Sequence, residues 1–129
     1  MDVTVTLVTA SVLGLMFIWL SARVINARVS NEVLIGEGDD QDLLFRIRTQ
    51  ANFTEYVPIF VLILGACEVM GGSKMVLAIV AAVFVLARLS HVPGMAQDAN
   101  LKFRQAGIIG SFTAIGALSL YGLYIGLLA

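Results

Sequence analysis

The chain has 129 residues, of which 59% are hydrophobic and only 13% charged, with a mean hydropathy of +0.93 and a formal net charge of −1. Soluble domains carry about 25% charged residues, so this composition predicts an integral membrane protein. The length excludes two ordinary domains, and a near-neutral chain without a basic stripe argues against a nucleic-acid partner. We therefore expect one membrane domain over residues 1–129.

The first apolar stretch predicts a membrane-spanning helix over about residues 3–27. Its uncharged part, Val3 to Leu20, is close to the roughly 20 residues that a span needs. Trp19 lies near the end of this part, where an interfacial aromatic residue is typical. Basic residues follow the stretch instead of preceding it, which argues against a signal peptide.

A polar loop, residues 30–40, leads into a second predicted helix over about residues 41–70. Asp39 or Asp40 is expected to cap this helix. At about 1.5 Å per residue the helix is roughly 45 Å long, which exceeds a hydrocarbon core of about 30 Å. Its first half is therefore expected at or beyond the membrane surface, and Pro58 is expected to bend it.

Two further apolar stretches complete the predicted bundle. Gly71-Gly72 ends the second helix and leads by a very short turn into a third, over about residues 73–91. Pro93-Gly94 is expected to end that helix, and the fourth is predicted over about residues 101–129. Four spans joined by short loops predict an all-α fold, an integral membrane four-helix bundle.

Basic residues predict the orientation of this bundle. Seven of the eight flank the first and third loops, and only Lys74 lies at the other end. The positive-inside rule then places the loops at residues 30–40 and 93–100 in the cytoplasm, with both termini on the far side.

Small residues in the fourth helix predict close packing. Gly110 with Ala114, and Gly122 with Gly126, are pairs spaced four apart. Such pairs let helices approach closely in lipid, either within the subunit or against a neighbour. The single Cys67 excludes an internal disulfide, and we expect it to pack as a small apolar residue.

Polar residues at helical spacing give the strongest functional signal. Arg48, Asn52 and Glu55 lie at i, i+4 and i+7 of the second helix, so they share one face. One interpretation is an ion pair of Arg48 with Glu55 through Asn52 that only fixes helix packing. The other is a site for an anionic, peptide-like ligand, because arginine binds carboxylates in a bidentate fork and glutamate accepts from ammonium. The residue pattern alone leaves both interpretations open.

Further cationic residues are expected at the same membrane face. Arg88 and His91 end the third helix, Lys102 and Arg104 begin the fourth, and Arg23 lies near the end of the first. In one bundle these side chains converge and would suit an anion, although the positive-inside rule alone gives the same pattern. Neither a second histidine nor a cysteine pair accompanies His91, so no metal site is expected.

The stretch from Arg46 to Pro58 resembles the signature of the MAPEG family, the membrane-associated proteins of eicosanoid and glutathione metabolism. Arg48, Asn52 and Glu55, with Pro58 soon after, match its arginine, asparagine, glutamate and proline. The form of this stretch is similar to the bacterial branch, and the resemblance covers the whole chain. It implies a four-helix subunit of a homotrimer in a membrane, with the bacterial inner membrane as the expected location.

The resemblance also implies glutathione as co-substrate, bound between neighbouring subunits near the cytoplasmic face. The residues that match the family's glutathione-binding positions are Arg23, Arg48, Asn52, Glu55, Arg88 and His91. Arg104 matches the arginine proposed to stabilise the glutathione thiolate, so it is the expected catalytic residue. A lipophilic second substrate would enter from the bilayer lipid, and no residue pattern identifies a hetero-partner.

The chain departs from the eicosanoid synthases at Met95, Gln105 and Ile108, where some of them carry tyrosine or serine. Prostaglandin or leukotriene synthesis is therefore not expected. The expected function is a glutathione transferase- or peroxidase-like activity on lipophilic electrophiles or hydroperoxides. The alternative is a non-catalytic membrane scaffold or accessory subunit, in which the polar residues only lock the bundle. A transporter or channel is disfavoured, because the other three helices carry no polar path through the mid-membrane.

Overall fold

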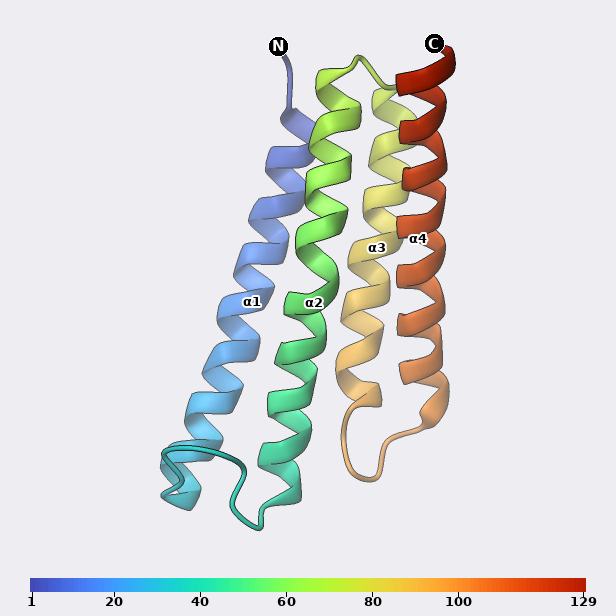
Figure 1. Ribbon diagram of the computed structural model, residues 1–129. Coiled ribbons are helices and arrows are strands. Elements are labelled where there is room, and N and C mark those ends of the chain that lie inside the picture. Colours follow the sequence, from blue (N-terminus) through green and yellow to red (C-terminus); the bar gives the residue numbers. More distant parts are fainter.

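The computed structural model describes all 129 residues and contains four helices and no strand. The helices are α1 (Thr4–Asn31), α2 (Gln41–Val69), α3 (Lys74–Gly94) and α4 (Leu101–Leu128). Successive helices run up and down beside one another, and both chain termini lie at the same end (Figure 1). The predicted all-α four-helix bundle is therefore confirmed.

Polar caps and a left-handed glycine set several helix ends. The Asp40 carboxylate accepts a hydrogen bond from the Asp42 N–H at 3.0 Å and begins α2. The Asn100 side chain accepts from the Lys102 N–H at 3.0 Å and begins α4 in the same way. Gly71 follows α2 with a φ of +83°, a conformation that glycine adopts without steric cost. The predicted cap and the predicted glycine stop of α2 are both confirmed.

Two helices run further than the sequence predicted. α1 continues to Asn31, and the chain turns away at Glu32, which has a left-handed φ of 54°. α3 continues through Pro93 instead of ending near His91. Only Gly94 follows Pro93 in the helix, so a bend at this proline displaces almost none of α3. α2 likewise runs unbroken through Pro58.

All four helices are long and apolar enough to cross a membrane. The 21 residues of α3 span about 31 Å, close to a hydrocarbon core of about 30 Å, whereas the 29 residues of α2 span about 44 Å. The extra length lies at one end, where α1 and α2 extend beyond α3 and α4 (Figure 1). The polar first part of α2 lies at this projecting end, as its length predicted.

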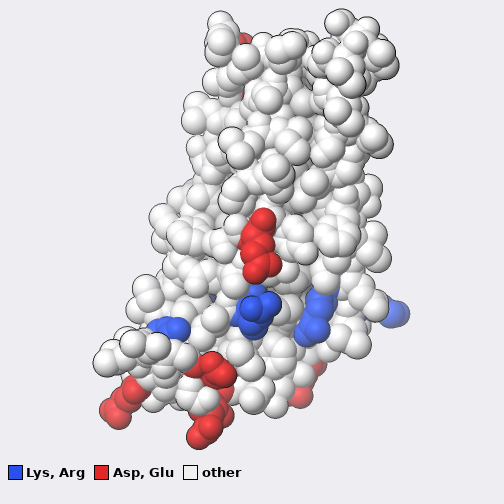
Figure 2. All heavy atoms as spheres, in the orientation of Figure 1, with Lys and Arg blue, Asp and Glu red and all other residues white.

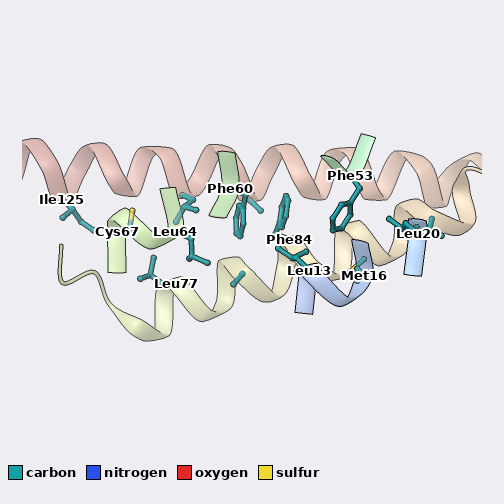
Figure 3. Packing of buried hydrophobic residues seen from close by; sticks show 14 residues of the cluster. Leu13, Met16, Leu20, Phe53, Phe60, Leu64, Cys67, Leu77, Phe84 and Ile125 are labelled. Atoms are coloured by element: carbon teal, nitrogen blue, oxygen red, sulfur yellow. The ribbon is translucent and has the colours of Figure 1, made fainter. Parts of the chain in front are cut away.

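Apolar side chains from all four helices form the core along the bundle axis (Figure 3). Phe60 of α2 and Phe84 of α3 stack in parallel, with 3.9 Å between ring centroids. Cys67 is buried in the same core, which confirms its expected packing role. Only 26 of the 129 residues are buried, and large apolar side chains cover the outside. Such an outer surface requires lipid or neighbouring protein around it.

Glycines bring α4 into close contact with α3. A Cβ atom on Gly107 would lie 2.6 Å from the Cβ of His91, and one on Gly110 would lie 2.8 Å from the Cβ of Ala87. Both distances are too short for any larger residue without displacement. The predicted close packing is thus confirmed within the subunit for this part of α4, whereas Gly126 faces open space.

A buried carboxylate joins the end of α2 to the beginning of α1. Glu68 is 6% exposed and accepts hydrogen bonds from the N–H groups of Val5 and Thr6 at 2.8 and 2.7 Å. First-turn amides have no partner inside their own helix, and a negative charge suits the helix N-terminus. Asp2 and Lys74 form an ion pair at the same end, and the hydrogen bond from Lys74 lowers the pKa of Asp2 well below its usual range.

Candidate ligand-binding site

Arg88 of α3 and Asn52 of α2 form the centre of the candidate site. The Nη1 atom of Arg88 donates to Oδ1 of Asn52 at 2.6 Å. The guanidinium group also lies over the ring of Tyr56, 5.2 Å from its centroid, in a cation–π contact. Because Asn52 and Tyr56 are four residues apart, they project from the same face of α2. The two predicted residues Arg88 and Asn52 are therefore brought together, and Tyr56 joins them.

The Arg88 guanidinium is buried without a neutralising anion. The residue is 2% exposed, and its Nε and Nη2 atoms have no hydrogen-bond partner. The ion pairs of the protein are Arg46 with Asp42 and Lys74 with Asp2, so no carboxylate pairs with Arg88. A buried charge without an oppositely charged partner costs several kcal/mol, on the order of the penalty for breaking a buried ion pair. A negatively charged group that reached the Arg88 guanidinium would therefore be stabilised there.

Arg48 and Glu55 lie exposed on the surface of α2. The interpretation that they pair with each other through Asn52 is wrong within the subunit, since neither forms an ion pair and the Asn52 oxygen accepts from Arg88 instead. Seven residues along a helix separate their Cα atoms by about 10 Å, so a direct ion pair would need both side chains fully extended toward each other. Figure 2 shows a band of basic residues across this half of the bundle, with an acidic residue above it.

Arg46 and Gln50 fasten α2 to α1 beside the candidate site. Arg46 donates from Nη1 to the backbone oxygen of Arg23 at 3.0 Å, and Gln50 Nε2 donates to the Ser21 hydroxyl at 2.7 Å. The guanidinium of Arg23 lies over the Trp19 ring, 5.4 Å from its centroid. Arg23 forms no hydrogen bond and no cation–π contact with the Arg88 cluster of its own subunit, and its Nη1 atom has no hydrogen-bond partner.

His91 and Arg104 lie where α3 meets α4. His91 is 3% exposed and packs against Gly107. The Nε atom of Arg104 donates to the Gly94 carbonyl at 3.3 Å, and Ser90 donates to the Phe103 carbonyl nearby. Neither His91 nor Arg104 forms a hydrogen bond to the Arg88 cluster.

The predicted site arginines of the first three helices nevertheless lie toward one end of the bundle. Arg23 lies eight residues before the end of α1, Arg48 seven residues after the start of α2, and Arg88 six residues before the end of α3. At about 1.5 Å per residue, each is within roughly 12 Å of the end of its helix. The cationic groups are therefore arranged around one interfacial level without direct contact among most of them.

Two participants in these contacts were missed from the sequence. Tyr56 carries a detectable signal, because an aromatic residue one helical turn after Asn52 shares its face. The role of Glu68 carries no local signal, since its partners Val5 and Thr6 are more than sixty residues away in the sequence.

Four apolar helices of membrane length, enclosing a buried arginine at one end, define a multi-pass integral membrane protein. The MAPEG family model matches residues 6–124, nearly the whole chain, and the chain therefore belongs to the MAPEG family. No curated protein sequence matches the chain. The resemblance carried by the stretch from Arg46 to Pro58 is thereby confirmed.

Proposed function

We propose that the protein is a membrane-bound glutathione transferase- or peroxidase-like enzyme that acts on lipophilic electrophiles or hydroperoxides. Its family includes glutathione transferases and peroxidases. The observation that carries the proposal is the buried Arg88 guanidinium, which has two unpartnered nitrogens and no carboxylate in its own subunit. An anionic tripeptide such as glutathione would supply negative charge beside this cation, so the residues present suit the ligand.

Each polar residue of α2 has a distinct role in this proposal. Arg48 is exposed and binds a glutathione carboxylate, while the exposed Glu55 accepts from the ligand ammonium group. The amide nitrogen of Asn52 is free to donate to the ligand backbone, because its oxygen is held by Arg88. Arg88 and His91 are buried, so they act from behind this surface by orienting Asn52 and supplying positive potential.

Arg104 is the proposed catalytic residue. A free thiol has a pKa of about 8.5, and a neighbouring cation lowers that pKa, so more of the thiol is ionised at neutral pH. The Gly94 carbonyl holds the Arg104 side chain at Nε, and its terminal nitrogens form no hydrogen bond within the subunit. With an aryl halide, the thiolate sulfur would form a bond to the ring carbon, and the halide would leave with the bonding electron pair.

A homotrimer completes this proposed site. Arg23 faces Trp19 rather than the Arg88 cluster of its own subunit, so its proposed contribution is to the glutathione site of a neighbour. The apolar outer surface and the open space at Gly126 leave room for a neighbouring helix. In this arrangement loops 30–40 and 93–100 lie on the cytoplasmic side of a bacterial inner membrane, and the lipophilic substrate arrives through the lipid.

The second candidate is a membrane scaffold that retains the family fold without catalysis. It is favoured by one observation: the polar contacts of Arg46, Gln50 and Asn52 all fasten one helix of the subunit to another. Under this alternative the Arg88–Asn52 contact serves only to hold α2 against α3.

Calorimetry on the purified protein with millimolar glutathione distinguishes the two functions. The enzyme proposal expects saturable binding that weakens in Arg48→Ala and Glu55→Ala but not in Lys102→Ala, an exposed cation outside the proposed site. No heat of binding with the wild-type protein would contradict glutathione as the ligand. The mass of the protein in detergent tests the assembly separately, because a stable monomer would remove the inter-subunit site.

A further inference from the structure

The loop between α1 and α2 presents two large apolar side chains outward. Leu34 and Ile35 are each 92% exposed, more than any other large apolar residue except Met1. They are neighbours in a loop that is otherwise rich in acids and glycine. Adjacent apolar side chains at such exposure indicate a surface that covers them in the native environment.

Hydrogen bonds hold this loop against the end of α1. Glu32 turns the chain back with a left-handed φ of 54°, and the Val33 N–H donates to the Arg28 carbonyl at 3.1 Å. The Arg28 guanidinium then donates from Nη1 to the backbone oxygens of Leu34 at 3.4 Å and Gly36 at 2.7 Å. The chain therefore first folds back beside the last turns of α1 before it reaches the start of α2 (Figure 1).

Val33, the residue before Leu34, points inward. Val33 packs against a small core formed by Val24, Ala27 and Leu43. A Cβ atom on Gly38 would lie 3.2 Å from the Val33 side chain, so the later part of the loop packs directly against Val33. Val33 is held inward while Leu34 and Ile35 already point outward, so contact of this pair with lipid requires no rearrangement of the loop.

The length of α1 places this loop at the membrane surface. The uncharged stretch from Val3 to Ala22 has 20 residues and spans about 30 Å, the thickness of the hydrocarbon core. Arg28 follows six residues later, about 9 Å further along the axis. The headgroup region adds roughly 5–8 Å on each side of the bilayer, so the loop tethered to Arg28 lies at its outer edge.

We propose that Leu34 and Ile35 form an interfacial anchor that inserts into the headgroup region of the bilayer. Val33 packs against Val24 and Ala27, so the folded-back loop turns from Arg28 toward the acyl chains. Apolar side chains that reach the boundary between headgroups and acyl chains gain free energy from burial there. Glu32, Glu37 and Asp39 flank the pair in the sequence, and acidic side chains repel anionic headgroups, so the anchor depends on apolar burial and not on lipid charge. It fixes the projecting end of α1 and α2 relative to the membrane, and it does not depend on the proposed enzymatic function.

Site-directed spin labelling tests this anchor in the full-length protein. A nitroxide is attached to Leu34→Cys, Ile35→Cys or Asp39→Cys in a Cys67→Ala background, in bilayers of phosphatidylethanolamine and phosphatidylglycerol. Collision rates with oxygen, which concentrates in lipid, are compared with those of a water-soluble nickel complex. Position 39 is the matched control, because it is an exposed position of the same loop where the native residue is polar.

The anchor predicts that oxygen collisions exceed nickel collisions at positions 34 and 35, with the reverse at position 39. The difference should persist when the phosphatidylglycerol fraction is raised. Nickel access at 34 and 35 equal to that at 39 would place the pair in water and overturn the proposal. An immobilised label shielded from both reagents would also overturn it, because a neighbouring protein surface would then cover the pair.

Discussion

Arg88 and Asn52 lie 36 residues apart in the chain, yet a 2.6 Å hydrogen bond joins the guanidinium of one to the amide oxygen of the other. The bond connects α3 to α2 at the level of the interfacial cations. It satisfies one nitrogen of a buried cation and leaves the charge itself unneutralised. Because Asn52 contacts this unneutralised cation directly, substitutions at position 52 test the role of the Arg88 charge.

Replacing Asn52 by aspartate supplies the missing anion. We expect Asn52→Asp to raise the thermal unfolding midpoint in detergent, because a carboxylate at the same place pairs with Arg88. The same change should abolish glutathione binding, since it neutralises the cation and removes the amide donor. Asn52→Leu should instead lower stability by about 1.5–3 kcal/mol, the loss of a hydrogen bond to a charged group. A lower midpoint for Asn52→Asp would show that Arg88 is already neutralised in the assembled protein.

Arg48 and Glu55 should affect binding without affecting stability. Both are exposed and unpaired, so removing either side chain leaves the subunit's internal contacts intact. A charge-assisted hydrogen bond contributes about 1.5–3 kcal/mol, so Arg48→Ala is expected to weaken glutathione binding about tenfold or more. Calorimetry and thermal unfolding are measured on the same samples. A large fall in the unfolding midpoint would instead assign Arg48 to packing in the assembly.

Removal of the Arg104 charge should separate chemistry from binding. We expect Arg104→Ala to lower kcat for conjugation of an aryl halide far more than it weakens glutathione binding. Loss of the cation raises the pKa of the bound thiol, so the rise of kcat with pH should move to higher pH. Arg104→Lys keeps the charge and should restore part of the activity at neutral pH. Equal losses of binding and turnover would contradict the proposed role in stabilising the thiolate.

The cap that Glu68 provides to α1 should be visible in amide exchange. Glu68→Ala leaves the N–H groups of Val5 and Thr6 without acceptors, at a cost of about 1–3 kcal/mol. We expect faster hydrogen exchange at the start of α1 and a lower unfolding midpoint. Asp2→Asn is the control, because it removes an exposed ion pair, whose contribution to stability is small. Unchanged exchange at the start of α1 in Glu68→Ala would exclude the cap.

Gly107 should tolerate no side chain. A Cβ there would lie 2.6 Å from the His91 Cβ, so we expect Gly107→Ala to force α4 away from α3 and to lower stability by about 1–3 kcal/mol. Gly116→Ala is the control, since nothing lies within 4 Å of a Cβ at that position. Alanine favours helix by up to about 1 kcal/mol over glycine, so this control should be neutral or stabilising. Equal effects of the two substitutions would argue against a close contact at Gly107.

The sequence predicted much of the fold because the dominant forces in a membrane are local. Apolar length defines a span, Asp40 begins α2 through the hydrogen bond that its side chain accepts, and Gly71 ends α2 through its left-handed backbone. The predicted end of α3 near His91 was wrong, because the free-energy cost of a proline in a helix depends on its position, and Pro93 lies in the last turn. Periodicity likewise predicted that Asn52 faces the same way as Arg48 and Glu55, but it offered partners only on the same helix. The true partner, Arg88, is brought in by the packing of α3 against α2.

Glu68 has a consequence for biogenesis. The carboxylate that completes the first turn of α1 is carried near the end of α2, on the side of the membrane where the chain begins. The first span therefore gains this carboxylate as the acceptor for its leading amides only after the second span has crossed the bilayer. α1 and α2 thus reach their native contacts together, as a helical hairpin. The ribosome must have synthesised the chain at least as far as Glu68 before the hydrogen bonds from Val5 and Thr6 can form.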